Sequence, residues 1–171
     1  MTLSLWVVTI IEKGFSISEI ATYSKFFGTI ATIVGGIIGG IASIHLGVMR
    51  SLFIGALISA LSNILFAWLA LVTADVKILA FVITADNVAS GFAGATFIVY
   101  LSALTSIKFT ATQYALFSST MLFLPKLIAG YAGGFVNLFG YPTFFIFTAI
   151  IGVPVLLLIT WINKTIKINK K

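Results

Sequence analysis

The amino-acid sequence predicts an all-α fold: a polytopic membrane protein with five full transmembrane helices and a partial one. Two features of the composition support this prediction, since 60% of the 171 residues are hydrophobic and only 8% are charged. The mean hydropathy is +1.19, so the chain has more apolar surface than a soluble domain of this size could bury. The third observation is the length of its apolar stretches.

Five stretches are apolar, and each is long enough to cross a bilayer core as a helix, which takes roughly 20 residues. They are residues 26–46, 51–72, 78–107, 110–139 and 143–161. Residues 1–11 are apolar too, but as a helix they would rise only about 16 Å, roughly half the hydrocarbon thickness. We expect them to be the end of a further helix rather than a signal peptide, because no basic residues precede them.

The positive charge of the chain indicates an orientation in the membrane rather than a nucleic-acid surface. The net charge is +6, but the basic residues lie in short loops and at the C-terminus instead of on one face. If the helices alternate in direction, one side of the membrane receives Arg50, Lys108, Lys164, Lys167, Lys170 and Lys171. That side is predicted to be cytoplasmic, and so is the C-terminus. The chain has no cysteine and a single histidine, which excludes a thiolate or histidine-cluster metal site.

Two glycine-rich segments, beginning at Gly14 and Lys108, match each other at an offset of 94 residues. Both open with the same predicted helix cap, a hydroxyl residue followed three residues later by Glu or Gln. The paired cap residues are Ser16 with Glu19 and Thr110 with Gln113. Because the unit contains three helices, the second copy would cross the membrane in the opposite direction, as in inverted-repeat transporters. The alternative is that glycine-rich membrane helices resemble one another by composition.

The repeat predicts one transmembrane domain over residues 1–171. It divides into a first three-helix repeat at 1–72, a second at 73–163, and a basic cytoplasmic tail at 164–171. The span beginning at residue 78 maps onto a segment that starts before Met1. The first repeat is therefore expected to be truncated at its N-terminus. Either the true start of the chain lies further upstream, or the chain is one part of a longer or split protein.

Matching stripes of polar and small residues run along two of the predicted helices. At helical spacing, the first includes Lys25 and Thr32, and its counterpart includes Ser119, Lys126 and Asn137. Lipid would favour large apolar side chains on such a face, so the stripes are predicted to face protein or water. Close helix packing is one interpretation. A cavity wall is preferred, because packing does not require the lysines.

The predicted helix at 78–107 contains a carboxylate, Asp86, about 13 Å from its first turn. A bare carboxylate at that depth costs at least about 2.5–3.5 kcal/mol on insertion scales. Asn87 follows Asp86 and is a further candidate to line a transport cavity. The helix face of Asp86 continues through Ser90 and Tyr100. Asp86 and Lys126 could form a structural ion pair or a pair that lines a transport cavity, or they could remain apart.

Several segments carry a family resemblance, namely DNVASGFAGATFIVYLSAL, KFTATQYALFSST and GGFVNLFGYPTFFIFT. Together they resemble the C-terminal half of the AmpG-type muropeptide permeases, a branch of the major facilitator superfamily. The short loop GGIASIHLGVMR resembles the cytoplasmic loop signature of that superfamily at Gly40, Gly47 and Arg50, although Ile44 occupies the usual acidic position.

The resemblance implies the fold of half a twelve-helix transporter, with the five full spans as helices 8 to 12 and two inverted three-helix repeats. It implies that helices 7, 8, 10 and 11 line the cavity and that helices 9 and 12 lie outside it. It also implies proton-driven import of anhydromuropeptides across the bacterial inner membrane, with no cofactor beyond the proton gradient. Asp86 would be the proton-titrating or substrate-ordering group, and Lys126 its partner or an anion contact.

The leading hypothesis is therefore a half-transporter that needs an N-terminal half for activity, supplied by a separate chain in a split protein. Its partners would be the lipid bilayer, that N-terminal half and a muropeptide-like substrate. The alternative is a non-transporting remnant or a membrane interaction subunit. An enzyme is not expected, because the sequence contains no recognisable pair of nucleophile and base.

Overall fold

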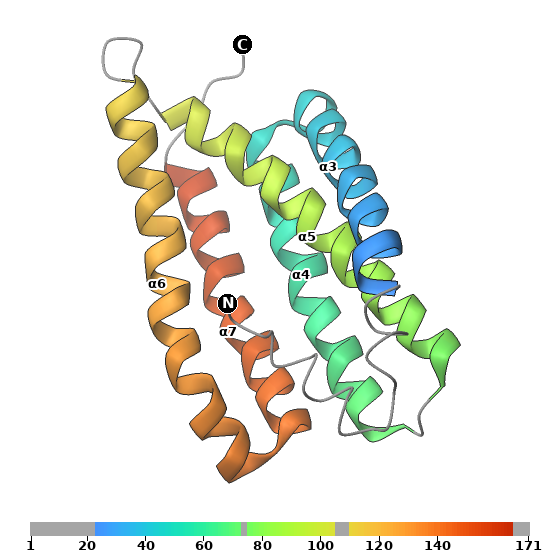
Figure 1. Cartoon of the computed structure of the whole chain (residues 1–171). Coiled ribbons are helices and arrows are strands. Elements are labelled where there is room, and N and C mark those ends of the chain that lie inside the picture. The colour runs from blue at the N-terminus through green and yellow to red at the C-terminus, as the bar shows by residue number, and fades with distance from the viewer. Residues whose placement is uncertain (1–22, 73–74, 105–109, 166–171) are drawn as a thin grey trace.

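A computed structural model describes residues 23–72, 75–104 and 110–165. A π-helical turn, η1 (Tyr23–Phe27), leads into the first of five α-helices (Figure 1). The helices are α3 (Gly28–His45), α4 (Val48–Leu71), α5 (Val76–Leu104), α6 (Thr110–Phe139) and α7 (Tyr141–Thr165). Each coincides with a predicted span. The predicted helix at 1–11 and the caps Ser16 and Glu19 lie outside the described residues.

Four of these helices are long and apolar enough to cross a membrane, judged by length and composition. They are Lys25–His45, Val48–Leu71, Val76–Leu104 and Tyr141–Thr165. The remaining helix, α6, is 30 residues long and contains Lys126. The prediction of an all-α polytopic membrane protein is confirmed.

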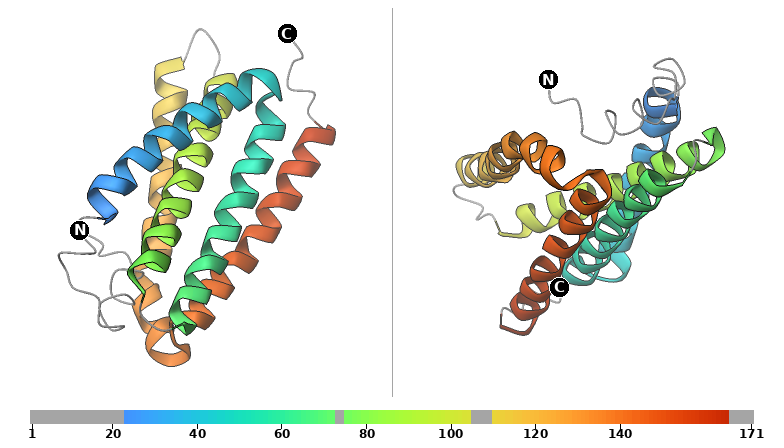
Figure 2. Two further views of the ribbon diagram at one scale, coloured as in Figure 1. Left: turned by 90° about the vertical axis from the view of Figure 1, so that its right-hand side faces the viewer. Right: turned by 90° about the horizontal axis from the view of Figure 1, so that it is seen from below.

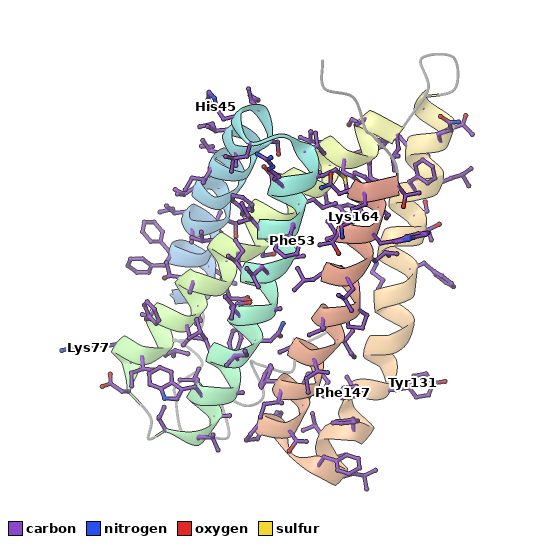
Figure 3. The ribbon with its side chains drawn as sticks, turned by 180° about the vertical axis from the view of Figure 1, so that it is seen from behind. His45, Phe53, Lys77, Tyr131, Phe147 and Lys164 are labelled. Carbon is purple, nitrogen blue, oxygen red and sulfur yellow. The ribbon has the colours of Figure 1, made fainter. Side chains whose placement is uncertain are left out.

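The two ends of the helix bundle differ in charge. His45 and Lys164 lie toward one end, which we call the His45 end, and Lys77 lies at the other, the Lys77 end (Figure 3). Arg50 is in the first turn of α4, directly after the turn that follows His45. Arg50 and Lys164 thus lie toward the His45 end, whereas Lys77 and Lys25, which precedes α3, lie away from it.

Glycines bring α3 and α5 into close contact. A Cβ atom added to Gly39 would lie 2.6 Å from the carbonyl oxygen of Phe92, and one added to Gly35 would overlap the carbonyl of Val88. Gly91 on α5 meets the backbone of α3 in the same way, at Thr32. Only glycine permits such backbone contact, which is a common way for membrane helices to associate.

Near the Lys77 end, α4, α5 and α7 share an apolar core. Leu79, Val82 and Ile83 of α5 are almost fully buried there. Phe66 of α4 stacks on Phe145 of α7, with ring centroids 5.4 Å apart. This core fixes the three helices relative to one another at one end.

Helix α6 lies to one side of the group formed by α3, α4 and α5 (Figure 2). It contacts α7 near the Lys77 end, where the ring of Phe135 lies 5.1 Å from that of Phe147. Among the described residues, nothing lies within 4 Å of a Cβ built on Gly130, Gly133 or Gly134. The glycine face of α6 is therefore open in the described part of the molecule.

The ends of the helices repeat at the offset found in the sequence. Helices α3 and α6 end at residues 45 and 139, and α4 and α7 end at residues 71 and 165, each pair 94 apart. Helix α3 runs toward the His45 end, whereas α6 runs away from it (Figure 1). The turns after α3 and α6 contain Gly47 and Gly140, with φ of 86° and 78°. The positions and directions of these helices agree with an inverted repeat, and the division of the chain at residue 72 stays a prediction.

Candidate functional site

A cavity of about 660 Å³ opens between α4, α5 and α7. Its polar residues lie together, on α4 and α5: Ser59, Ser62, Asn63, Asp86 and Ser90. The rest of its lining is mostly apolar and comes from all three helices, including Met49, Leu52, Phe97, Tyr100, Leu158 and Ile159. We call this the Asp86 cavity. A mostly apolar pocket with a few convergent polar groups is typical of a ligand site.

Ser62 holds the carboxylate of Asp86. Its Oγ lies 2.8 Å from Oδ1 of Asp86 and 2.9 Å from the carbonyl oxygen of Ser59. The amide of Asn63 donates to the same carbonyl at 3.0 Å. A hydroxyl has one proton, so Ser62 donates either to Asp86 or to Ser59. This geometry connects the carboxylate to a short hydrogen-bonded chain on α4.

Asn87 lies on a different face of α5 from Asp86, because successive residues of a helix are about 100° apart. Its Oδ1 lies 3.0 Å from Oγ1 of Thr32, which is also 2.9 Å from the carbonyl oxygen of Gly28, and its amide donates to the carbonyl of Ile83 at 2.7 Å. A Cβ on Gly28 would lie 3.1 Å from the same amide. Asn87 and Thr32 therefore join α5 to α3 and do not line the Asp86 cavity.

The stripe on α3 is a packing face, which was the alternative to a cavity wall. Gly39 and Ser43 are buried, and the hydroxyl of Ser43 donates to the carbonyl of Gly39 in its own helix. Lys25, by contrast, is exposed. The glycines of this stripe are explained by the close approach of α5, and the lysine is not part of that contact.

The residues predicted on α6 do not reach the Asp86 cavity. Ser119, Lys126 and Asn137 are exposed. Within the part of the chain that the structure describes, Lys126 forms no ion pair with Asp86, whose side-chain partner is Ser62. Of the three possibilities for this pair, the structure favours the one in which the two residues remain apart.

Three cavity residues on α4 were missed, namely Ser59, Ser62 and Asn63. The resemblance implies that α4 and α7, the ninth and twelfth helices of the family fold, lie outside the cavity, whereas both line the Asp86 cavity. The sequence does indicate a polar face on α4, because the three residues are spaced i, i+3 and i+4 in an otherwise apolar segment. Asp86, Ser90 and Tyr100, which were predicted, do line the cavity.

The remaining predicted residues concern turns and caps. Gly47 adopts the positive φ that favours glycine, and Arg50 is exposed in the first turn of α4. Gly40 has open space around it. Helix α6 begins at Thr110, within one residue of the start that a cap at Thr110 predicts. The side chain of Thr110 lies outside what the structure describes, so its pairing with Gln113 stays a prediction.

No family model matches the chain. It is 35% identical over 158 residues to the protein named "Putative transporter AmpG 4" of Rickettsia felis, and 34% identical over 158 residues to its namesake in Rickettsia conorii. It is also 34% identical over 157 residues to "Putative transporter AmpG 1" of Rickettsia prowazekii. Each match covers 92% of this chain but only 35–38% of the relative, so the chain spans about a third of the length of the curated relatives it matches.

Proposed function

We propose that this multi-pass membrane protein supplies the C-terminal half of a proton-coupled muropeptide transporter. The proposal is supported by its homology to proteins named as AmpG transporters. The fold would be that of the major facilitator superfamily, in the bacterial inner membrane. The proposal that the substrate is a muropeptide rests on the resemblance of segments such as KFTATQYALFSST to the muropeptide permeases. The observation that carries the proton coupling is the position of Asp86 in a cavity beside Ser62.

The hydrogen bonds around Asp86 suit reversible protonation. When the carboxylate is ionised, Ser62 donates to it. When it is protonated, it can donate to Oγ of Ser62, and Ser62 then donates to the carbonyl of Ser59. The carboxyl group keeps a partner in both states, which lowers the cost of holding either state away from water. A proton could thus bind and leave without breaking the contact between α4 and α5.

Transport itself is proposed to need a second half. The Asp86 cavity is bounded by helices of one half only, whereas a facilitator alternates access by rocking two halves around a site between them. In the part of the chain that the structure describes, the glycine face of α6 is open, and further helices can pack against it. Whether the other half belongs to the same polypeptide or to another does not change this proposal.

Uptake of labelled muropeptide tests the function. Cells without their own permease would express this chain alone, or with the N-terminal half of a full-length homologue. We expect uptake only in the second case, and loss of that uptake when the proton gradient is collapsed. Uptake by the chain alone would contradict the half-transporter proposal.

The Asp86→Asn variant tests the role of the carboxylate within that assembly. Asparagine keeps the size and hydrogen-bonding ability of the side chain but cannot titrate, so uptake should be abolished while the amount of protein in the membrane is unchanged. Asp75→Asn is the matched control, because Asp75 is exposed just before α5. Normal uptake by the Asp86→Asn form would remove Asp86 from the mechanism.

A membrane interaction subunit is a second candidate, favoured by the same open face of α6. It predicts that the chain co-purifies with another membrane protein and that no N-terminal half restores uptake. The two candidates therefore differ in the outcome of the uptake experiment.

A further inference from the structure

A second cavity, of about 320 Å³, lies between α4 and α7. It is formed by Met49, Arg50, Phe53 and Ile54 of α4 and by Ile159, Thr160 and Asn163 of α7. Met49 and Ile159 are buried and line the Asp86 cavity as well. The proposed transport function uses neither Arg50 nor Asn163. We call this site the Arg50 cavity.

The chemistry of the Arg50 cavity fits a phosphate group above an apolar floor. Arg50, Thr160 and Asn163 are exposed, whereas Phe53 and Ile54 are half-buried. A guanidinium presents a planar set of donors that matches phosphate oxygens. Arg50 also lies in the first turn of α4, where the helix dipole is positive, and Lys164, in the last turn of α7, offsets the negative end of the dipole of that helix.

No acidic residue offsets this charge in the described part of the chain. Its two carboxylates are Asp75, just before α5 at the Lys77 end, and Asp86, in the other cavity. Phe53 and Lys164 both lie in the half of the molecule nearer His45 (Figure 3). The Arg50 cavity is therefore electropositive.

The depth of the cavity places it at a membrane boundary. Trp161, next to Thr160, is 63% exposed, and exposed tryptophans of membrane helices are enriched at the interface between hydrocarbon and headgroups. One helical turn further from the His45 end, Leu57 and Leu157 are exposed on α4 and α7. Hydrocarbon thus borders the cavity on one side and the headgroup region on the other.

From these contacts we propose that the Arg50 cavity binds the headgroup of an anionic phospholipid. The phosphate contacts Arg50 and Asn163, and the acyl chains lie over Leu57 and Leu157. Basic pockets between membrane helices bind anionic lipids on the side where these lipids are abundant. The site belongs to the outer surface of the α4–α7 pair, so the proposal holds whether or not the chain transports a substrate.

Lipid retention measures this site directly. The purified chain would be equilibrated with mixtures of phosphatidylglycerol and phosphatidylcholine, and the retained lipids counted by native mass spectrometry. We expect selective retention of phosphatidylglycerol, reduced about fivefold in Arg50→Gln, since one basic residue at a membrane surface contributes about 1 kcal/mol. Lys77→Gln is the matched control, because it removes the same charge at the opposite end. Equal losses in the two variants, or no lipid selectivity in the unchanged chain, would overturn the proposal.

A filling variant separates the cavity from general attraction to positive charge. Thr160→Trp occupies the cavity and leaves Arg50 charged, so it should lower phosphatidylglycerol retention as Arg50→Gln does. Unchanged retention in this variant would show that the cavity is not the binding site. Inorganic phosphate should not displace the lipid, because it lacks the acyl chains that contact Leu57 and Leu157. Displacement by millimolar phosphate would assign the site to a free anion and overturn the lipid proposal.

Discussion

Asp86 is held within an apolar helix by a hydroxyl from a neighbouring helix. An isolated carboxylate in a membrane helix costs about 2.5–3.5 kcal/mol on insertion scales. The hydrogen bond from Ser62, at 2.8 Å, offsets part of that cost. Because the two residues come from α5 and α4, this bond also ties the charge of the cavity to the packing of the bundle.

Removal of the Ser62 hydroxyl should weaken proton coupling without unfolding the protein. A hydrogen bond to a charged group contributes about 1.5–3 kcal/mol, so Ser62→Ala should lower uptake by the assembled transporter roughly tenfold or more. Ser62→Thr keeps the hydroxyl and should retain most of the uptake. Thr165→Ala is the control, since Thr165 is exposed and its hydroxyl donates to the carbonyl of Trp161 in its own helix. Equal uptake by the Ala and Thr variants of Ser62 would show that the hydroxyl has no role.

The position of Asp86 could be singled out from the sequence, but its partner could not. A carboxylate in an apolar segment can be recognised from the sequence alone. Its partner cannot, because Ser62 is 24 residues away along the chain. Which serine reaches it depends on the rotation of α4 about its own axis. Lys126, the expected partner, belongs to α6, and no described residue of α6 lines the cavity.

At the scale of elements, the contact between α3 and α5 depends on glycines at specific positions. Gly35 and Gly39 of α3 are buried against the backbone of α5, while Gly40, next in sequence, has open space beside it. Adjacent glycines of one helix thus have different roles. The glycine pattern by itself indicated close packing but did not indicate which helix is the neighbour.

This difference gives a matched pair of substitutions. Gly39→Ala places a methyl group 2.6 Å from the carbonyl of Phe92 and should destabilise the protein by about 1–3 kcal/mol, as overpacking does. Gly40→Ala meets no neighbouring atom and should be neutral or slightly stabilising, by up to about 1 kcal/mol. Thermal unfolding in detergent measures both. Equal midpoints for the two variants would contradict the packing of α3 on α5.

Element boundaries were predictable because they depend on local sequence. Apolar length and the flanking charged or glycine residues set the helix ends, and Gly47 and Gly140 mark two turns through their positive φ. Helix faces were less predictable. Membrane helices are apolar around most of their circumference, so periodicity carries little information about which side meets protein and which meets lipid.

For the whole molecule, the uneven distribution of basic residues predicts one orientation in the membrane. Arg50 and Lys164 belong to the His45 end, and Lys77 to the opposite end (Figure 3). Positive side chains are retained on the cytoplasmic side, so the His45 end should face the cytoplasm. The Arg50 cavity would then face the leaflet in which anionic lipids attract basic residues.

Cysteine labelling can test this orientation cleanly, because the chain contains no cysteine. A Lys77→Cys variant should react with a membrane-impermeant maleimide in cells whose inner membrane is intact. A Lys164→Cys variant should react only after that membrane is permeabilised. The reverse pattern would place the C-terminus outside the cytoplasm.

The sequence by itself determined the membrane-spanning class, the positions of five long helices, the offset of 94 residues and the presence of a carboxylate within a span. These features follow from local apolar length and from direct comparison of segments. Only the tertiary structure decided that Asp86 contacts Ser62, that Asn87 contacts Thr32, and that a polar face of α4 completes the cavity. The physical reason is that contacts between distant segments set the rotation and spacing of the helices, through glycines for α3 and α5 and through apolar side chains for α4, α5 and α7. Apolar composition alone leaves both unspecified.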